Sequence, residues 1–513
     1  MTEQLHVPDA HYSAATTREA AARLTADEFR AAGHELVDAI AEFLEELPSR
    51  RLTSGETRDQ IRALIDADAS IPEEGSDAGA LLRSTARLLF DHSLFNGHPR
   101  FLGYITSSPA HIGILGDLLA AAVNQNVGSW RLGPVATEIE SQTVRWISEL
   151  VGYPAGGSGI MVSGGNMANT VSLFAARAAA AGQESRRAGL ARAGTLRVYT
   201  SEETHTWVKK AADLAGLGTD AVRWIPTDGE LRMDVDALRA AIAHDRHAGD
   251  RPMMVVGTGG SVSTGAVDPL QAIGELCREE QVWFHVDGAY GAFAAQVPGV
   301  PSDLAALALA DSVAVDPHKW LYAPLEAGCV LVRDEALLRD AFSYSVAYFH
   351  FGGEPLNYLD LGPQNSRGFR ALKVWLALRQ IGRRGYLQSI ADDIALGERL
   401  HERAAAHPEL EAVTLGLSTA TFRVVPPDLR ARAGMPDVAS YLDTLNQQVL
   451  ERMQREGEAF VSHGIVRGRY LLRGCVVNFN TTAADIDRVV EIAARVGREV
   501  DAAERPEALR AER

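Results

Sequence analysis

The sequence predicts an α/β protein whose mostly parallel central sheet is flanked by helices. Between residues 96 and 385, segments with helical periodicity alternate with short runs, most of which are continuous and apolar. Such runs are typical of parallel strands that helices cover on both faces. After residue 385 the pattern changes, and helical stretches are mixed with strand-like runs. We therefore expect a large domain at 96–385, a smaller α+β carboxyl-terminal domain at 386–513 and an N-terminal helical segment at 1–95.

Each expected element rests on the spacing of its apolar residues. Strands of the large domain are expected at 159–162, 196–199, 222–225, 253–256, 282–286, 312–315 and 328–332. The carboxyl-terminal elements are expected to be strands at 420–425 and 475–480 and helices at 386–406, 438–455 and 483–500. Near the N-terminus, Asp27 is expected to cap a helix with one apolar stripe. That helix either packs on a partner subunit or lies on the surface, and the sequence leaves both readings open.

The composition excludes several classes of protein. The chain has 513 residues and a formal net charge of −17, without a cluster of Lys and Arg. A nucleic-acid surface needs a basic patch, so we expect no nucleic-acid partner. No apolar run is long enough to span a bilayer, and residues 1–10 show no secretory signal. Cys277, Cys329 and Cys475 are too widely spaced for a disulfide framework or a zinc site, so we expect buried thiols, no metal and a cytoplasmic location.

Lys319 and Asp287 are the most informative residues. Lys319 lies between the expected strands 312–315 and 328–332, and Asp287 ends the expected strand 282–286. Ligands of parallel sheets bind beyond the carboxyl ends of the strands. An amine and a carboxylate at neighbouring strand ends can serve both ends of pyridoxal phosphate, which needs a lysine for its Schiff base and an acid for its ring nitrogen. A loop lysine and a turn-capping aspartate are the plain alternatives.

Two further features acquire a role in this context. Gly164 and Gly165 stand between the strand 159–162 and a helix, where backbone N–H groups can receive a phosphate. His205 follows the strand 196–199, where its imidazole can stack on a cofactor ring. Either feature alone is commonly an ordinary connection or a satisfied polar residue. It is their order along the chain, together with Asp287 and Lys319, that favours a cofactor site.

The chain resembles the group II pyridoxal-phosphate-dependent decarboxylases, which include aromatic L-amino-acid decarboxylases. The resemblance runs from about residue 27 to residue 500. The motifs that carry it are HVDGAY at 285–290, DPHKW at 316–320, TH at 204–205, NGHPRF at 96–101, GFRALKVW at 368–375 and VNFNTT at 477–482. It implies the type I fold of pyridoxal phosphate enzymes, as in aspartate aminotransferase, and a homodimer whose active site lies at the subunit interface.

Roles for individual residues follow from the resemblance. It implies that Lys319 forms the Schiff base, that Asp287 keeps the ring nitrogen protonated and that His205 and Ala289 pack on opposite faces of the ring. The residues implied to lie near the phosphate or the ring hydroxyl are Gly165, Asn166, His318 and Ser261. The implied reaction is loss of CO₂ from an L-amino acid to give an amine.

The substrate segments match at 101–110 and 124–130, and a dimer mate usually contributes the second. They nominate Tyr104, Thr106, Asn126 and Trp130. Tyr104 and Trp130 suit an aromatic or apolar side chain. The segment 124–130 has no Arg or Lys for a distal carboxylate, so we favour an aromatic L-amino acid over a branched aliphatic one.

A loop tyrosine decides between related reactions. The resemblance implies a tyrosine that protonates the product carbon, and we assign it to Tyr348, with Tyr344 in reserve. Relatives with phenylalanine there tend toward oxidative deamination to an aldehyde. An aldehyde synthase, a carbon–carbon lyase and a catalytically silent binding relative remain the alternatives.

Overall fold

The computed structural model describes residues 20, 22–154, 156–344 and 356–510. The chain divides into two compact units. The first comprises Met1–Arg50 and Glu56–Ser93, and the second comprises Arg51–Gly55 and Leu94–Arg513. The active-site expectations all concern the second unit.

The first unit is helical. Its helices are α1 (Ala26–Glu46), α2 (Arg58–Leu64) and α3 (Ala78–His92), and the rings of Phe43 and Phe90 stack 4.4 Å apart. Thr25, not Asp27, caps α1: its hydroxyl accepts from the Glu28 N–H, and the Glu28 carboxylate accepts from the Thr25 N–H. The expectation for Asp27 is therefore wrong, because a threonine followed three residues later by glutamate satisfies two backbone donors reciprocally. No residue of the three helices is buried.

A seven-stranded sheet forms the centre of the second unit, in the order β1-β7-β6-β5-β4-β2-β3. Its strands are β1 Ser158–Val162, β2 Leu196–Ser201, β3 Val222–Ile225, β4 Arg251–Thr258, β5 Trp283–Asp287, β6 Ser312–Val315 and β7 Gly328–Val332. Pairing is parallel from β6 through β3, and β7 runs antiparallel to both neighbours. Each strand lies on one of the expected apolar runs, so the mostly parallel α/β class is confirmed.

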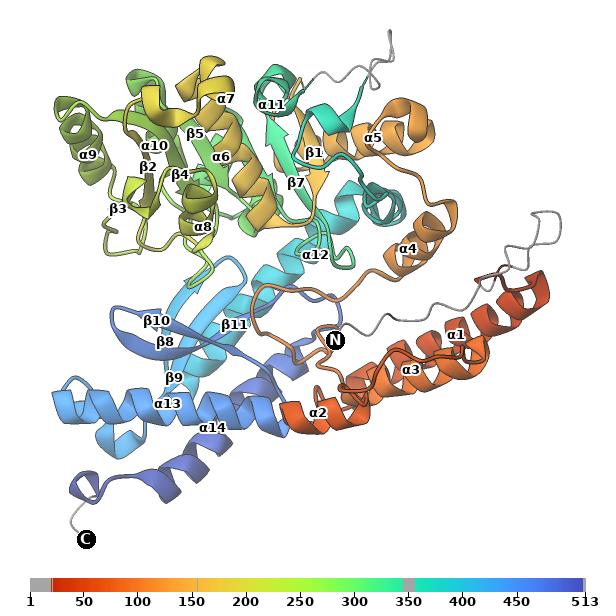
Figure 1. Cartoon of the computed structure of the whole chain (residues 1–513). Coiled ribbons are helices and arrows are strands. Elements are labelled where there is room, and N and C mark those ends of the chain that lie inside the picture. Colours follow the sequence, from red (N-terminus) through yellow and green to blue (C-terminus); the bar gives the residue numbers. More distant parts are fainter. Residues whose placement is uncertain (1–19, 21, 155, 345–355, 511–513) are drawn as a thin grey trace, which may run out of the picture. The chain divides into compact units, whose positions relative to one another are not determined.

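Helices cover both faces of this sheet (Figure 1). The helices of this part of the chain are α4 His111–Val123, α5 Pro134–Val151, α6 Gly165–Ala181, α7 Glu184–Ala188, α8 Trp207–Leu214, α9 Val235–His247, α10 Leu270–Glu280, α11 Glu335–Phe342 and α12 Ala371–Ala406. Of these, α5, α6, α8, α9, α10 and α11 pack on strands of the central sheet. Strand β4 shows the two faces clearly. Met254 and Val256 pack in one core with Leu173 of α6, whereas Val255 packs in another with Leu270 of α10. Burial on both faces explains why these strands are mostly apolar.

A second, four-stranded sheet follows, in the antiparallel order β10-β11-β9-β8. Its elements are β8 Leu410–Gly416, β9 Thr419–Val424, α13 Pro436–Glu456, β10 Ser462–Val466, β11 Arg469–Cys475 and α14 Ala483–Glu504. Phe422, Leu445 and Val489 belong to its core. The expected α+β carboxyl-terminal region is therefore present. The expected boundary at residue 385 falls within α12, three residues after Gly382 interrupts that helix, and the domain division stays a prediction.

The strand expected at 475–480 is wrong. The chain leaves the sheet after Cys475, and the Val476 N–H bonds to the Ser418 carbonyl. The Asn478 amide then donates to the His98 carbonyl at 2.9 Å. The apolar pattern of this segment favours a strand. The buried asparagine instead holds it in an irregular conformation, because its side chain donates to a backbone carbonyl far away in the sequence.

Within the ranges that the structure describes, no helix combines the length and the apolar character needed to cross a bilayer. Nor do three or more His, Cys, Asp or Glu side chains come together there in a way that could hold a metal ion.

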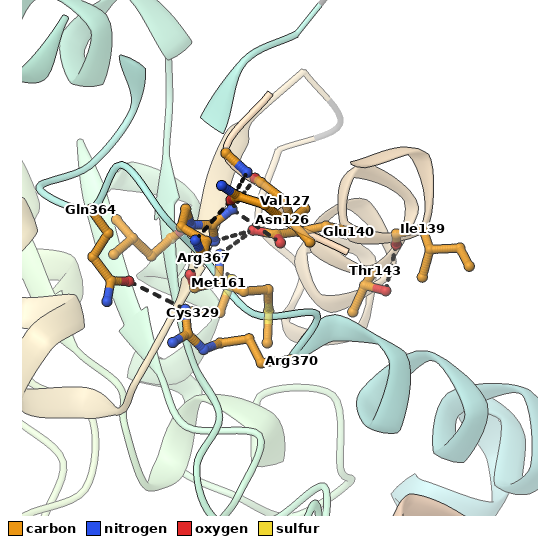
Figure 2. Close-up of polar contacts among 12 residues, drawn as sticks. Asn126, Val127, Ile139, Glu140, Thr143, Met161, Cys329, Gln364, Arg367 and Arg370 are labelled. Atoms are coloured by element: carbon orange, nitrogen blue, oxygen red, sulfur yellow. Dashed lines mark hydrogen bonds and ion pairs between the residues drawn. The ribbon is translucent and has the colours of Figure 1, made fainter. Parts of the chain in front are cut away.

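A buried ion pair joins several segments around the central sheet (Figure 2). Arg367 and Glu140 of α5 have fully buried side chains and bond at 2.6 Å and 3.2 Å. The guanidinium also donates to the carbonyls of Val127 and Met161, and Glu140 accepts from the Met161 N–H. The backbone N–H of Arg367 donates to the side-chain oxygen of Asn126. One cation thus ties the segment 124–130 and strand β1 to helix α5.

We expect Arg367→Met to lower the free energy of unfolding by about 3–5 kcal/mol, because it leaves the Glu140 charge buried without its partner. Arg145→Met is the matched control, since Arg145 pairs with Glu149 on the same helix with both side chains more than half exposed. Arg145→Met should lower the free energy of unfolding by no more than about 0.5 kcal/mol. Urea unfolding at one protein concentration measures both, and equal losses would contradict the role given to the buried pair.

Candidate active site

Two carboxylates and a lysine meet at the carboxyl edge of the central sheet. Asp287 is the last residue of β5, and Asp316 follows β6 directly. The two strands are parallel neighbours, with Asp287 opposite Ala314. Both carboxylates and Lys319 line one cavity of about 230 Å³. The sequence-predicted residues Tyr104, Gly165, Asn166, His205 and Ala289 line the same cavity.

Lys319 is held by Asp316. Its Nζ lies 3.1 Å from Asp316 Oδ2, and the Asp316 side chain is only 3% exposed. His318 Nε2 lies 3.6 Å from the same oxygen. Burial lowers the pKa of the His318 imidazole, although Asp316 opposes that change. Asp316 Oδ1 is buried without a hydrogen-bond partner among the described residues, so this carboxylate retains an unused acceptor beside the lysine.

Asp287 is oriented by two donors. Its Oδ2 accepts a hydrogen bond of 2.8 Å from the indole Nε1 of Trp207. Its Oδ1 accepts a longer bond of 3.3 Å from the Ala289 N–H. The residue is 8% exposed and lines the cavity. A buried carboxylate with one strong donor keeps a fixed orientation and retains acceptor capacity for a ligand.

His205 lies between β2 and α8 and is exposed to solvent in the single chain. Burial lowers the pKa of its imidazole below the usual value, with Asp287 acting in the opposite direction. Its Nδ1 accepts from the Trp207 N–H at 3.2 Å, which leaves Nε2 as the protonated nitrogen of a neutral ring. A neutral, flat side chain at the cavity can stack on an aromatic ligand without adding charge.

The turn between β1 and α6 forms one end of the cavity. Gly165 is the first residue of α6, and the Ala168 N–H makes the bond to Gly164 O. The N–H groups of the preceding first-turn residues have no partner within the helix and favour an anion. A Cβ atom on Gly165 would lie 2.6 Å from Asp316 Oδ2 and 3.0 Å from Ala289 Cβ. Only glycine permits this close approach of the helix to the sheet edge.

The buried side chain of His285 contacts a residue that lines the cavity. His285 is fully buried, and its ring nitrogens lie 2.7 Å from Asn169 Oδ1 and 2.9 Å from Ser312 Oγ. Burial lowers the pKa of His285 to about 4, so the ring is neutral at pH 7. Since His285 and Asp287 are two residues apart on β5, they point to the same face of the sheet. Asn169 also lines the cavity.

Ser261 does not line the cavity as we expected it to. Its hydroxyl lies 3.0 Å from Thr264 Oγ1 and accepts from the Thr264 N–H, within its own turn. Thr258, at the end of β4, lines the cavity instead, with its hydroxyl 3.2 Å from that of Thr204. Its N–H donates to the buried Asp268. The role of Ser261 stays a prediction.

Of the four predicted substrate residues, Tyr104 lines the cavity, and Thr106, Asn126 and Trp130 do not. Tyr104 lines the cavity and is 59% exposed. Thr106 has a buried hydroxyl with no partner among the described residues. Asn126 Oδ1 instead accepts from the Gly128 N–H, in addition to the Arg367 bond described above. Trp130 lines a separate hollow, with its indole donating to Glu138 at 2.9 Å.

Of the two candidate loop tyrosines, Tyr344 belongs to the described part of the chain, and it does not line the cavity. Tyr348 lies outside that part. Tyr344 is 65% exposed, and the Arg186 guanidinium lies 4.2 Å from its ring centroid. The assignment of the loop tyrosine stays a prediction.

Sequence reasoning missed Asp316, Trp207 and Thr258. A usable signal existed for Asp316 and Thr258, because both stand at the carboxyl ends of expected strands, where ligands bind in parallel sheets. Trp207 gave no such signal. An indole two residues after a histidine is indistinguishable in the sequence from an ordinary core residue.

Comparison with known proteins identifies the class to which this fold and site belong. Residues 59–424 match the pyridoxal-dependent decarboxylase conserved domain. The chain therefore belongs to the family of group II pyridoxal-phosphate-dependent decarboxylases, as the sequence motifs indicated, and the cofactor of this family is pyridoxal phosphate.

Relatives and solved structures agree over most of the chain. An aromatic-L-amino-acid decarboxylase of Bacillus atrophaeus is 32% identical, covering 91% of this chain and 95% of the relative. A 4-hydroxyphenylacetaldehyde synthase of Rhodiola rosea is 30% identical, covering 75% of this chain and 78% of the relative. The crystal structure of Oryza sativa TDC with PLP and tryptamine superposes with a TM-score of 0.85 at 26% identity, covering 93% and 99% of the two chains. The family thus contains both amino-acid decarboxylases and aldehyde synthases.

The residues of the cavity fit pyridoxal phosphate chemically. Lys319 offers an amine, Asp287 offers an oriented carboxylate, and the α6 N-terminus offers backbone donors for a phosphate. Gly165 has no side chain, so the α6 N-terminus can lie close to Asp316 with its backbone N–H groups available to an anion. A Cβ atom at this position would collide with Asp316.

Proposed function

We propose that the protein decarboxylates an aromatic L-amino acid to the corresponding amine and CO₂. One observation carries the proposal: Lys319 and Asp287 line a single cavity at the carboxyl edge of the sheet, beside the α6 N-terminus. The family membership supports the cofactor, and the relatives support amino acids as substrates.

The chemistry divides between cofactor and protein. Bound pyridoxal phosphate supplies an electron sink for the pair of electrons that the departing carboxylate leaves behind. Lys319 would hold the cofactor covalently, and Asp287 would keep a proton on its ring nitrogen through a charge-assisted hydrogen bond. His205 and Ala289 would pack against the ring. Binding of the substrate side chain orients the scissile bond, which converts binding energy into rate.

The aromatic preference rests on the cavity and on the relatives. Tyr104 lines the cavity, and large amphipathic rings favour aromatic contacts. The segment 124–130 contains no Arg or Lys that would bind a distal carboxylate. The Bacillus atrophaeus relative is named for aromatic L-amino acids. We therefore place aromatic substrates above branched aliphatic ones.

A homodimer completes the proposed site. Helix α4 exposes Leu115, Leu118, Leu119 and Val123, each more than half exposed to solvent in the single chain. A contiguous apolar helix face of this kind marks a protein interface. Asn126 and Trp130, which do not line this chain's cavity, follow α4 closely in sequence and can serve the site of a second copy.

The three cysteines support a reducing compartment. Cys277, Cys329 and Cys475 are buried and free, and free buried thiols are usual in cytoplasmic proteins. We propose a cytoplasmic location, which cell fractionation checks.

Lys319→Ala should abolish the visible absorbance of the covalent link to the cofactor and with it amine formation, because no other side chain takes the place of Nζ. Lys209→Ala is the control, since Lys209 is an exposed lysine of α8. Absorbance spectra of the purified holoproteins and product analysis with aromatic L-amino acids measure both. Unchanged absorbance in Lys319→Ala would place the Schiff base elsewhere, and a wild-type holoprotein that yields no amine from any amino acid would refute the proposed reaction.

An aldehyde synthase is the second candidate, because the Rhodiola rosea relative has that name. Tyr348→Phe should slow amine formation by about 10²-fold or more, as expected for loss of a proton donor, and raise aldehyde output. Tyr344→Phe should change neither. Oxygen uptake and the release of ammonia and peroxide distinguish the reactions. If Tyr344→Phe gives the aldehyde instead, the assignment to Tyr348 is wrong, and if the wild type consumes oxygen, the synthase is the better description.

Leu118→Glu should convert the proposed dimer to monomers by placing a charge on the apolar face of α4, and should reduce amine formation in parallel. Leu415→Glu is the control, because Leu415 is an exposed leucine of the carboxyl-terminal sheet. Sedimentation velocity of the holoproteins measures the assembly. A wild-type monomer with full activity would contradict the shared site.

A further inference from the structure

Trp207 makes a buried hydrogen bond to the carboxylate of Asp287. It is the first residue of α8 and is 2% exposed. Its Nε1–H donates to Asp287 Oδ2 at 2.8 Å. An indole is a donor only, so the direction of this bond is fixed. Hydrogen bonds to an ionised carboxylate are about twice as strong as those between neutral groups.

The hydrogen bond from Trp207 determines which carboxylate oxygen of Asp287 can accept a hydrogen bond from a ligand. Oδ2 is held by the indole, and Oδ1 accepts only the longer 3.3 Å bond from the Ala289 N–H among the described residues. Rotation of the carboxylate about its Cβ–Cγ bond would break the Trp207 bond. Trp207 therefore fixes the plane of Asp287 and leaves Oδ1 the greater acceptor capacity.

The indole is itself held in place. Trp207 packs in a core with Leu173 of α6 and with Met254 and Val256 of β4. The His285 ring meets it edge-on, with centroids 6.0 Å apart and an interplanar angle of 83°. His285 is fixed in turn by Asn169 and Ser312. Helix α8 also packs on α6, so the buried indole is enclosed by well-packed elements.

We propose that Trp207 is a positioning residue that keeps the proton on the cofactor ring nitrogen, a proposal that rests on the proposed function. An N–H donor stabilises the charged form of a carboxylate relative to its protonated form. The pair of anionic Asp287 and protonated ring nitrogen is thereby favoured over the neutral pair. A protonated ring is the stronger electron sink, so Trp207 acts on the rate of bond breaking through Asp287, without contacting the substrate.

The test replaces the indole by a ring without a donor. In Trp207→Phe, loaded with pyridoxal phosphate labelled with ¹⁵N in the ring, the nitrogen resonance should move toward that of a neutral pyridine. Amine formation at saturating substrate should fall by about 10- to 100-fold, the range expected for one hydrogen bond to a charged group, with little change in KM. Trp375→Phe is the matched control, because that indole donates to Gln142 at 2.7 Å and does not line the cavity. It should leave the nitrogen resonance and kcat unchanged.

A second measurement uses the wild-type side chain and does not depend on the folding of Trp207→Phe. The chain has seven tryptophans, so their indole N–H signals can be assigned by substitution. The Trp207 indole proton should exchange slowly with solvent, and Asp287→Asn should move its signal more than the others.

The outcomes separate the two proposals. A protonated ring nitrogen in the wild type that stays protonated in Trp207→Phe, with kcat unchanged, overturns the role of Trp207 alone. An indole signal indifferent to Asp287→Asn overturns it as well. Failure of the wild-type protein to bind pyridoxal phosphate covalently would instead overturn the proposed function.

Discussion

The parallel pairing of β5 with β6 is the constraint on which the site depends. Because both strands run in the same direction and lie side by side, their carboxyl ends meet at one edge. Asp287 and Asp316 emerge there, and the turn after Asp316 returns Lys319 to the same cavity. The α6 N-terminus reaches this edge because Gly165 has no side chain to collide with Asp316. The pairing of β5 with β6 thus places Asp287 and Asp316 at one edge of the sheet.

The charges of the cavity complement a cationic ring. Two carboxylates and one lysine amine leave the cavity with an excess of negative charge. Burial lowers the pKa of the His205 imidazole, which favours its uncharged form over one that would offset this charge. Two buried carboxylates favour a nearby positive charge. Lys319 supplies one beside Asp316, and in the proposed site a protonated ring nitrogen would supply one beside Asp287. The anionic phosphate would be received by backbone donors at the helix terminus instead.

Much of this architecture could be predicted from the sequence, for a physical reason. Strands covered on both faces are mostly apolar, so the strands of the central sheet stand out as near-continuous apolar runs. The carboxyl-terminal sheet was harder to predict. Strand β10 alternates buried and exposed residues and β8 is only partly buried, so neither gives a continuous apolar run. The apolar residues near Asn478 were mistaken for a strand, although that asparagine bonds to the His98 carbonyl of a distant segment.

Site residues could be predicted where the type and position of a residue alone indicate its chemical role. A lysine and an aspartate at strand ends indicated the cofactor chemistry, and the family motifs fixed the assignment. The Trp207 bond to Asp287 spans 80 positions of the chain, and such a pairing is visible only once the fold is known. Ser261 shows the converse, since its hydroxyl is engaged within its own turn.

The central claim is that one lysine and one aspartate hold the same pyridine ring. Its most direct test is borohydride reduction of the holoprotein, followed by proteolysis and mass spectrometry of the pyridoxyl peptide. We expect the modification on Lys319, in the peptide that contains Asp316. A pyridoxyl group on any other lysine would contradict it.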